Sequence, residues 1–152
     1  MGSLSASTAA ELLESIRANQ VVGDEGVPDV YDELPGVEID FMLGTWRGGV
    51  FHYDHPFGKR LLAINWYGKR FRGPDDVEPL LVHGSGGEIE SYEAFGLARL
   101  REVRFRGKVS MAMLYDKQPL IDHFRRLSDD VVIGLADEKN KPSTYYFYLA
   151  RV

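Results

Sequence analysis

The segment Gly44-Thr45-Trp46-Arg47-Gly48 constrains the fold of this chain more than any other stretch. Gly44 can adopt backbone angles that a Cβ atom forbids, so the chain can bend sharply before a strand begins. Trp46 is a large apolar side chain that needs a deep site in the core and an acceptor for its indole N–H. Gly48 and Gly49 have no side chain, which allows a bulge or a close backbone approach beneath that indole. The segment therefore predicts a strand that begins at a bend and buries Trp46 as a structural plug.

The rest of the chain reads as short strands separated by turns. Strands are predicted at residues 46–53, 61–67, 77–82, 98–106, 109–115, 119–127, 131–137 and 144–151, with a turn at 54–58. Periodicity alone leaves a helix open for 61–67, and Pro79 indicates an edge strand at 77–82. Turn signals every 8–12 residues or so are typical of an antiparallel sandwich or barrel. Closure into a barrel would also remove the exposed sheet edges.

The N-terminal part contrasts with this pattern. Thr8-Ala9-Ala10-Glu11 reads as a capping box, which predicts an amphipathic helix at residues 8–19. Residues 21–40 are acidic and broken by Gly and Pro, so we expect a wrapping loop there, followed by one helical turn within 37–43. The chain is predicted to be a single domain over residues 1–152. It comprises the N-terminal helix and wrapping segment (1–40), the tryptophan motif part (41–83) and a C-terminal meander that closes the barrel (88–152), with a flexible Gly-rich loop at 84–87.

Two sets of motifs resemble known families. Residues 43–48 are similar to the G-x-W-x-G domain family, in which a Trp-Tyr-Gly-Lys-x-Phe element follows, here residues 66–71. The second half resembles the domain of unknown function that usually accompanies it, through residues 115–125, 134–137 and 147–151. This resemblance implies a mainly all-β fold, a lipocalin-like antiparallel β-barrel with a short N-terminal α-helix, and no agreed activity. It also implies structural roles for Gly44, Trp46, Gly48 and Arg151, because an Arg from the last strand of such barrels packs over the first-strand Trp.

Composition excludes several function classes. A formal net charge of −5 argues against a nucleic-acid partner. The chain has no Cys, so disulfides and thiolate catalysis are excluded. Its four His residues show no metal-binding spacing, and we expect neither a metal nor a cofactor. The sequence shows no signal peptide and no apolar run near the ~20 residues that span a bilayer, so we expect no stable membrane insertion and a cytoplasmic protein.

A barrel of about eight strands can hold one small ligand, so the inward-facing polar and aromatic residues are the candidate site. Alternation in the strand at 119–127 places Asp122 and Phe124 on one face and His123 and Arg125 on the other, and it leaves open which face lines the cavity. Asp122 and His123 are the candidates for acid–base catalysis. The candidate ligand-binding residues are His52, Trp66, Tyr67, Lys69, Met111, Met113, Tyr115, Asp116, Phe124 and Arg125.

Two functions fit these features. The first is binding of a hydrophobic or amphipathic, lipid-like small molecule in the barrel cavity, because aromatic residues form 12% of the chain and catalytic motifs are scarce. The alternative is an enzyme, a cofactor-independent isomerase or cyclase that acts on a terpenoid or polyketide intermediate by acid–base catalysis in the same cavity. The expected partner is a small hydrophobic ligand, and a homodimer is also compatible with the aromatic-rich strands.

Overall fold

The computed structural model describes residues 8–20, 23, 25–51, 55–141 and 145–152. Its strands are β1 (Gly44–Val50), β2 (Trp66–Gly73), β3 (Asp76–His83), β4 (Ile89–Ser91), β5 (Ala98–Phe105), β6 (Lys108–Tyr115), β7 (Leu120–Arg126), β8 (Val131–Glu138) and β9 (Tyr145–Arg151). Its helices are α1 (Ala9–Arg17), α2 (Val27–Glu33), α3 (Ile39–Met42) and α4 (Pro56–Ala63). The predicted meander from β5 to β9 is thereby confirmed, with ends that differ by a residue or two.

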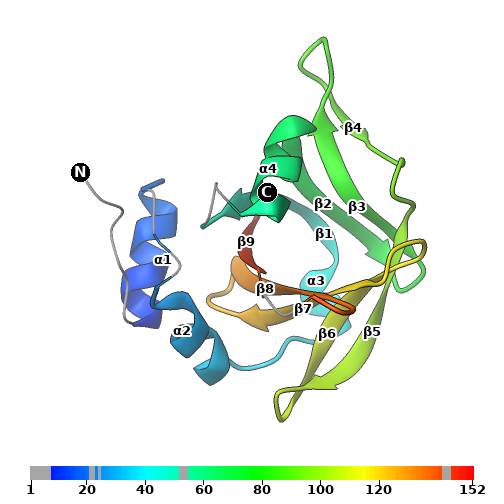
Figure 1. Cartoon of the computed structure of the whole chain (residues 1–152). Helices are drawn as coiled ribbons and strands as arrows, with labels where there is room; N and C mark the ends of the chain where they lie inside the picture. Colours follow the sequence, from blue (N-terminus) through cyan, green and yellow to red (C-terminus); the bar gives the residue numbers. More distant parts are fainter. Residues whose placement is uncertain (1–7, 21–22, 24, 52–54, 142–144) are drawn as a thin grey trace.

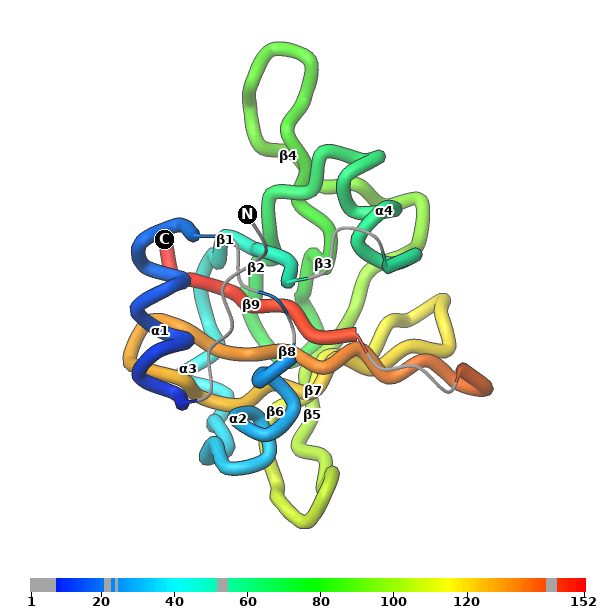
Figure 2. Tube along the Cα trace, turned by 60° about the vertical axis from the view of Figure 1, so that its left-hand side comes forward, coloured from blue at the N-terminus to red at the C-terminus, as the bar shows by residue number. Residues whose placement is uncertain are grey.

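The strands form a closed antiparallel barrel (Figure 1). Neighbours follow the order β2-β1-β9-β8-β7-β6-β5-β3, and pairing of β2 with β3 closes the ring. Strand β4 pairs with β3 outside the ring, and the β3–β4 hairpin stands out beyond the barrel (Figure 2). The register joins β3 to β5 at one residue pair, Val77 and Ala98, so these two strands are the least extensively paired neighbours in the ring. The predicted barrel with an N-terminal helix is confirmed.

The first two helices cover the outer face of β8 and β9 (Figures 1 and 2). The predicted capping box is present, because the Thr8 hydroxyl accepts a hydrogen bond from the Glu11 N–H at 3.2 Å. Helix α2 corrects the prediction of a wrapping loop over residues 21–40. Pro28 lies in its first turn, where a missing N–H costs no hydrogen bond. Because these helices bury the outside of β8 while the core buries its inside, this strand is apolar on both faces.

Two further predictions were wrong in the middle of the chain. Residues 56–58, predicted as part of a turn, and residues 61–63, predicted as strand with a helix left open, lie in α4. This helix starts with Pro56 and is capped by the His55 ring at 3.1 Å from the Phe57 N–H, and residue 54 lies outside the described residues. Strand β3 is not an edge, because it pairs with β2 on one side and with β4 and β5 on the other. Pro79 is tolerated because the β2–β3 register shifts between Gly68 and Arg70, where a proline without an N–H fits.

The tryptophan plug closes one end of the barrel. Trp46 is fully buried, and its indole N–H donates to the Met42 carbonyl oxygen at 2.8 Å. As predicted, the Arg151 guanidinium lies over this indole, with its central carbon 4.2 Å from the ring centroid. Gly44 bends the chain with a φ of +122°. Gly48, however, lies against a different indole, because a Cβ there would be 2.1 Å from the Trp66 ring.

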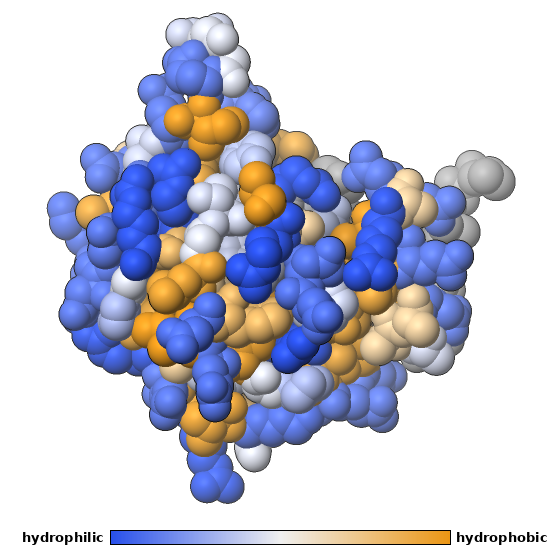
Figure 3. Space-filling model, turned by 180° about the vertical axis from the view of Figure 1, so that it is seen from behind, coloured by the Kyte–Doolittle hydropathy of each residue, from blue (hydrophilic) through white to orange (hydrophobic). Residues whose placement is uncertain are grey.

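The surface seen from behind is mainly hydrophilic, with apolar side chains exposed between charged ones (Figure 3). In the described part of the chain, the exposed large hydrophobic residues are Leu62, Phe95, Leu97, Val109 and Val152. None of the helices in that part is long and apolar enough to cross a bilayer.

Candidate functional site

A small cavity lies inside the barrel beneath α4, and we call it the inner cavity. Its volume is about 30 Å³, enough for about two water molecules. Helix α4 and strands β2, β6, β7, β8 and β9 all contribute to its wall, so residues distant in sequence meet there. Its lining residues are Phe57, Leu61, Trp66, Lys69, Tyr115, Leu120, Asp122, Ala136, Tyr145 and Phe147.

Two residues in the wall of this cavity, Lys69 and Asp122, form an ion pair. The Lys69 Nζ lies 3.2 Å from the Asp122 Oδ2, and their side chains are only 3% and 4% exposed. Strand alternation points Lys69 inward from β2 and Asp122 inward from β7, which are not neighbouring strands. The Lys69 ammonium also donates to the Pro79 carbonyl oxygen at 3.0 Å, at the register shift between β2 and β3. The barrel therefore holds an ion pair across its interior.

Aromatic rings surround the Lys69 Nζ. The ring centroids of Trp66, Tyr115 and Phe147 lie 5.6, 5.7 and 5.4 Å from this nitrogen. Such distances permit a cation–π attraction to each ring. The Trp66 indole is itself fixed, because its N–H donates to the Gly68 carbonyl oxygen at 2.9 Å. The Lys69 nitrogen thus has a carboxylate, a carbonyl and three ring faces around it.

Burial shifts the pKa of each group in this cavity toward the neutral form. Desolvation raises the pKa of Asp122, although the nearby Lys69 opposes the shift. Desolvation lowers the pKa of Lys69, with Asp122 acting in the opposite direction. The pKa of Tyr115 is raised well above its ordinary value by burial and by the negative charge of Asp122. Proton transfer from Lys69 to Asp122 is therefore less unfavourable here than it is in water.

A second, larger pocket adjoins the inner cavity, and we call it the outer pocket. Its volume is about 210 Å³, below the roughly 300–1,000 Å³ of pockets for drug-sized ligands. Phe57, Leu61, Tyr115 and Leu120 line both spaces, so these side chains form the partition between them. The remaining lining residues are mostly apolar and are Arg60, Ala63, Ile64, Leu80, Phe95, Gln118, Pro119 and Glu138.

The structure brings four of the predicted site residues together and places three others in the same core. Trp66, Lys69, Tyr115 and Asp122 line the inner cavity. Met111, Met113 and Phe124 also belong to the barrel core, but they do not line this cavity.

The other predicted site residues lie away from the inner cavity. Tyr67 packs its ring on His83, 5.4 Å between centroids, and does not line the cavity. Asp116 is exposed and lies 3.8 Å from Arg99. His52 lies outside the described residues. His123 and Arg125 face the outside of the barrel, beneath α2.

Arg125 holds α2 against the barrel, and His123 lies on the same face of β7. The His123 ring stacks on Phe105 at 3.7 Å between centroids, and its Nε2 lies 3.2 Å from the Asp137 carboxylate. Burial lowers the pKa of His123, and Asp137 partly opposes this shift. Arg125 donates to the carbonyl oxygens of Tyr31 and Phe105, each at 3.0 Å. Because adjacent strand residues point to opposite faces, His123 cannot share the inner cavity with Asp122.

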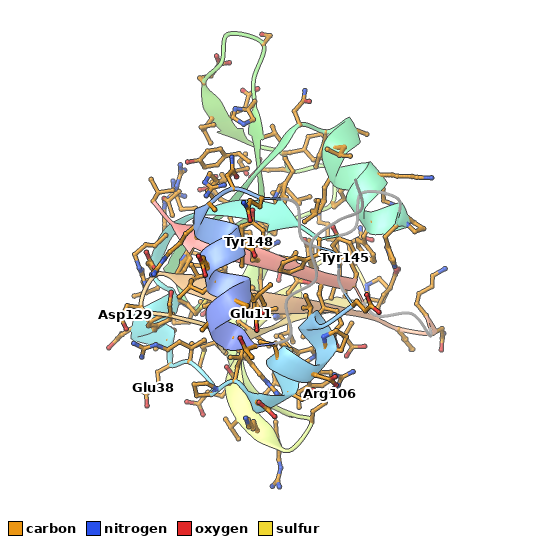
Figure 4. All side chains as sticks on the ribbon, turned by 90° about the vertical axis from the view of Figure 1, so that its left-hand side faces the viewer. Glu11, Glu38, Arg106, Asp129, Tyr145 and Tyr148 are labelled. Atoms are coloured by element: carbon orange, nitrogen blue, oxygen red, sulfur yellow. The ribbon has the colours of Figure 1, made fainter. Side chains whose placement is uncertain are left out.

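The two faces of β9 show the same separation. Tyr148 packs on the outer side against Phe51, with 5.4 Å between ring centroids, while Tyr145 lines the inner cavity. In Figure 4, Tyr148 lies beside α1, Tyr145 lies farther along β9, and Arg106 projects next to α2. The wall of the cavity and the surface on which α1 and α2 pack are thus formed by opposite faces of the same strands.

Sequence reasoning missed the contribution of α4 and β9 to the site. Phe57 and Leu61 line both spaces, and their i, i+4 spacing is the helical signal that could have identified them. Tyr145 and Phe147 point inward by strand alternation, a period that the predicted last strand already contained. In the part of the chain that the structure describes, no three His, Asp or Glu residues are grouped as a metal site would need.

Comparisons with known proteins agree on this architecture. Residues 29–87 match the model of the family described as GXWXG protein, and residues 96–151 match the domain of unknown function DUF4334. The crystal structure of a protein from Thermomonospora curvata is similar with a TM-score of 0.91 and 51% identity, covering 95% of this chain and 97% of that one. The comparison with curated proteins gave no match. The chain therefore belongs to the family of GXWXG proteins that carry DUF4334 as their second part.

Proposed function

We propose that this protein binds a small hydrophobic or amphipathic, lipid-like molecule at the α4 end of the barrel. The observation that carries the proposal is an apolar outer pocket that adjoins a cavity with a buried ion pair. Ligand sites typically combine a mostly apolar wall with a few convergent polar groups, which is this arrangement.

The two spaces suit the two ends of an amphipathic ligand. The apolar body would lie in the outer pocket against Phe57, Leu61 and Leu120. Its polar end would replace water in the inner cavity and accept hydrogen bonds from Lys69 or Tyr115. A ligand with a polar end would gain a hydrogen bond to one of these groups, which is worth about 0.5–1.5 kcal/mol. The site would thus favour apolar molecules that carry one terminal oxygen function.

The experiment that tests binding is native mass spectrometry of the purified protein, followed by denaturing extraction of any bound molecule. Titration with a fluorescent lipophilic probe complements it and allows a matched pair of variants on α4. Leu61 lines both spaces, whereas the next residue, Leu62, lines neither and is 53% exposed. Leu61→Glu should weaken probe binding by about tenfold or more, while Leu62→Glu should leave it unchanged. Equal effects of the two variants, or a protein that takes up neither lipid nor probe, would contradict the proposal.

A specific observation also favours the enzymatic alternative. Asp122 and Tyr115 line one cavity with Lys69, so an acid, a base and a hydrogen-bond donor converge on one small volume. A cofactor-independent isomerase or cyclase for a terpenoid or polyketide intermediate would use Asp122 to take a proton from the carbon beside a carbonyl group. Lys69 and Tyr115 would stabilise the developing oxyanion, and Asp122 would return the proton at a new position.

This alternative assigns no proton transfer to His123, which faces the opposite side of β7. It predicts that Asp122→Asn abolishes exchange of the substrate α-hydrogen with deuterated solvent under conditions in which circular dichroism shows that the variant is folded. Exchange that persists in the folded variant would contradict this alternative.

A further inference from the structure

We propose that Lys69 is a covalent attachment site, which forms an imine with an apolar aldehyde or an unhindered ketone bound in the outer pocket. This inference rests on the proposed binding function and specifies the chemical class of the ligand. It starts from the position of one amine. Lys69 is a buried wall residue of the inner cavity, whereas the other five lysines of the chain are exposed or half-buried.

The surroundings of Lys69 meet the requirements for a nucleophilic amine. An amine attacks a carbonyl carbon only in its neutral form, and an apolar site favours that form. Asp122 is 3.2 Å away and can take the proton that Lys69 gives up. The Pro79 carbonyl oxygen holds the nitrogen at 3.0 Å and thereby fixes its position at the wall of the cavity. Desolvation shifts the pKa values of Lys69 and Asp122 in the directions that this transfer needs.

The reaction balances with these two residues alone. Lys69 first transfers a proton to Asp122, which gives a neutral amine and a carboxylic acid. The nitrogen then adds to the carbonyl carbon, the C=O π electrons move to oxygen, and Asp122 protonates that oxygen. Asp122 next removes one proton from the nitrogen, so that a neutral carbinolamine remains. Asp122 finally protonates the hydroxyl group, the C–O bond breaks with release of water, and the nitrogen lone pair forms the C=N bond of a protonated imine.

The product fits the same surroundings as the free lysine. The protonated imine carries the positive charge of the original ammonium, and the Asp122 carboxylate stays beside it as the counter-ion. The ring faces of Trp66 and Phe147, 5.6 and 5.4 Å from the Lys69 nitrogen, attract either cation. The covalent step therefore leaves the number of charges in the cavity unchanged, and no new charge has to be desolvated.

The dimensions of the two spaces restrict the ligand further. The inner cavity, at about 30 Å³, admits a carbonyl group with a small substituent and little else. The carbonyl must therefore stand at or next to the end of the molecule, as in an aldehyde or a methyl ketone. The rest of the ligand must be apolar, because it lies against Phe57, Leu61 and Leu120 in the outer pocket.

The test is reductive trapping with an apolar aldehyde as the probe. The intact protein is incubated with cinnamaldehyde and sodium cyanoborohydride, and the modified lysines are then located by peptide mass spectrometry. We expect one adduct per chain, on Lys69, before the exposed Lys59, Lys117, Lys139 and Lys141 react. Modification that follows solvent exposure, with Lys69 unmodified, would overturn the inference.

Two variants extend this test. Lys69→Arg keeps the positive charge but cannot form an imine, so the early adduct should disappear from a variant that circular dichroism shows to be folded. Asp122→Asn keeps the amine but removes the acid that protonates the carbinolamine hydroxyl, and it should slow adduct formation by about tenfold or more. An early adduct that survives Lys69→Arg would overturn the inference. A wild-type protein that binds the probe but gives no Lys69 adduct would also overturn it, and would leave the proposed binding function intact.

Discussion

The Lys69–Asp122 pair allows a prediction whose size and sign both follow from the structure. The variants are Lys69→Met, Asp122→Val and the double variant. At 3.2 Å, with the effective dielectric constant of about 20 that suits protein sites, the attraction is on the order of 5 kcal/mol. Desolvation of two ions costs several kcal/mol each and largely offsets this gain. Removing one partner therefore strands a buried charge, whereas removing both strands none.

The cost of each single variant is bounded by the cost of neutralising the remaining partner. Deprotonation of Lys69 at pH 7, which is about 3.5 pH units below its ordinary pKa of 10.5, costs about 5 kcal/mol. Protonation of Asp122 at pH 7, which is about 3 pH units above its ordinary pKa of 3.8, costs about 4 kcal/mol. Each single variant should thus lose about 3–5 kcal/mol of unfolding free energy, and the double variant should lie near the wild type or above it.

The two single variants should depend on pH in opposite directions. In Lys69→Met the folded chain keeps a proton on Asp122 that the unfolded chain releases above pH 3.8, so stability falls as pH rises. In Asp122→Val the unfolded chain binds a proton on Lys69 below pH 10.5 that the folded chain lacks, so stability rises with pH.

Urea unfolding followed by circular dichroism at about pH 5, 7 and 9 measures these slopes. Single variants that cost less than about 1 kcal/mol, with no pH slope, would refute the reasoning, because the pair would then be solvated. A stable double variant that no longer binds the lipophilic probe would indicate that the pair serves the ligand and not the fold.

Three other predictions follow from single contacts. Gly48→Ala should lose about 1–3 kcal/mol in urea unfolding, because its Cβ would be 2.1 Å from the Trp66 ring, whereas Gly73→Ala, with open space at its Cβ, should lose much less. Arg151→Lys should lose about 1–2 kcal/mol, because lysine cannot both stack on an indole and donate to two carbonyls. Because burial lowers the pKa of His123, wild-type stability should fall as pH drops through 6.5 and below, and His123→Gln should flatten that slope.

Each of these predictions has an outcome that would contradict it. Equal costs for alanine at Gly48 and at Gly73 would mean that the Trp66 ring moves aside freely. An Arg151→Lys variant with unchanged stability would show that the stacked guanidinium contributes only its charge. A slope near pH 6 that persists in His123→Gln would have to come from other titrating groups.

The plug and the meander could be predicted from the sequence because their signals are local. Trp46 and its flanking glycines identify the first strand, and turns such as Gly107-Lys108 and Ser128–Asp130 divide the second half into strands. Helix α4 was harder, because an apolar run such as 61–65 fits a helix or a strand equally well, and the helical residues before it were read as a turn.

The face of β7 that lines the cavity could not be predicted from the sequence. A strand with one solvent-exposed face shows an alternation of polar and apolar residues, but β7 is covered on both sides. Phe124 packs in the core while Arg125 is buried beneath α2. The meeting of Lys69 with Asp122 carries no local signal either, because it depends on closure of the whole barrel across non-neighbouring strands.

Closure of the barrel sets an order of events during synthesis of the chain. Strand β1 pairs with β9, and Arg151 donates to the Leu43 carbonyl oxygen 108 positions earlier. Until β9 has left the ribosome, β1 and β8 each expose an unpaired edge, and Trp46 lacks the cation that covers it. Contacts of such long range also make folding slow. Every newly made copy therefore passes through a period in which β1 is open to aggregation, and the synthesis and pairing of β9 end that period.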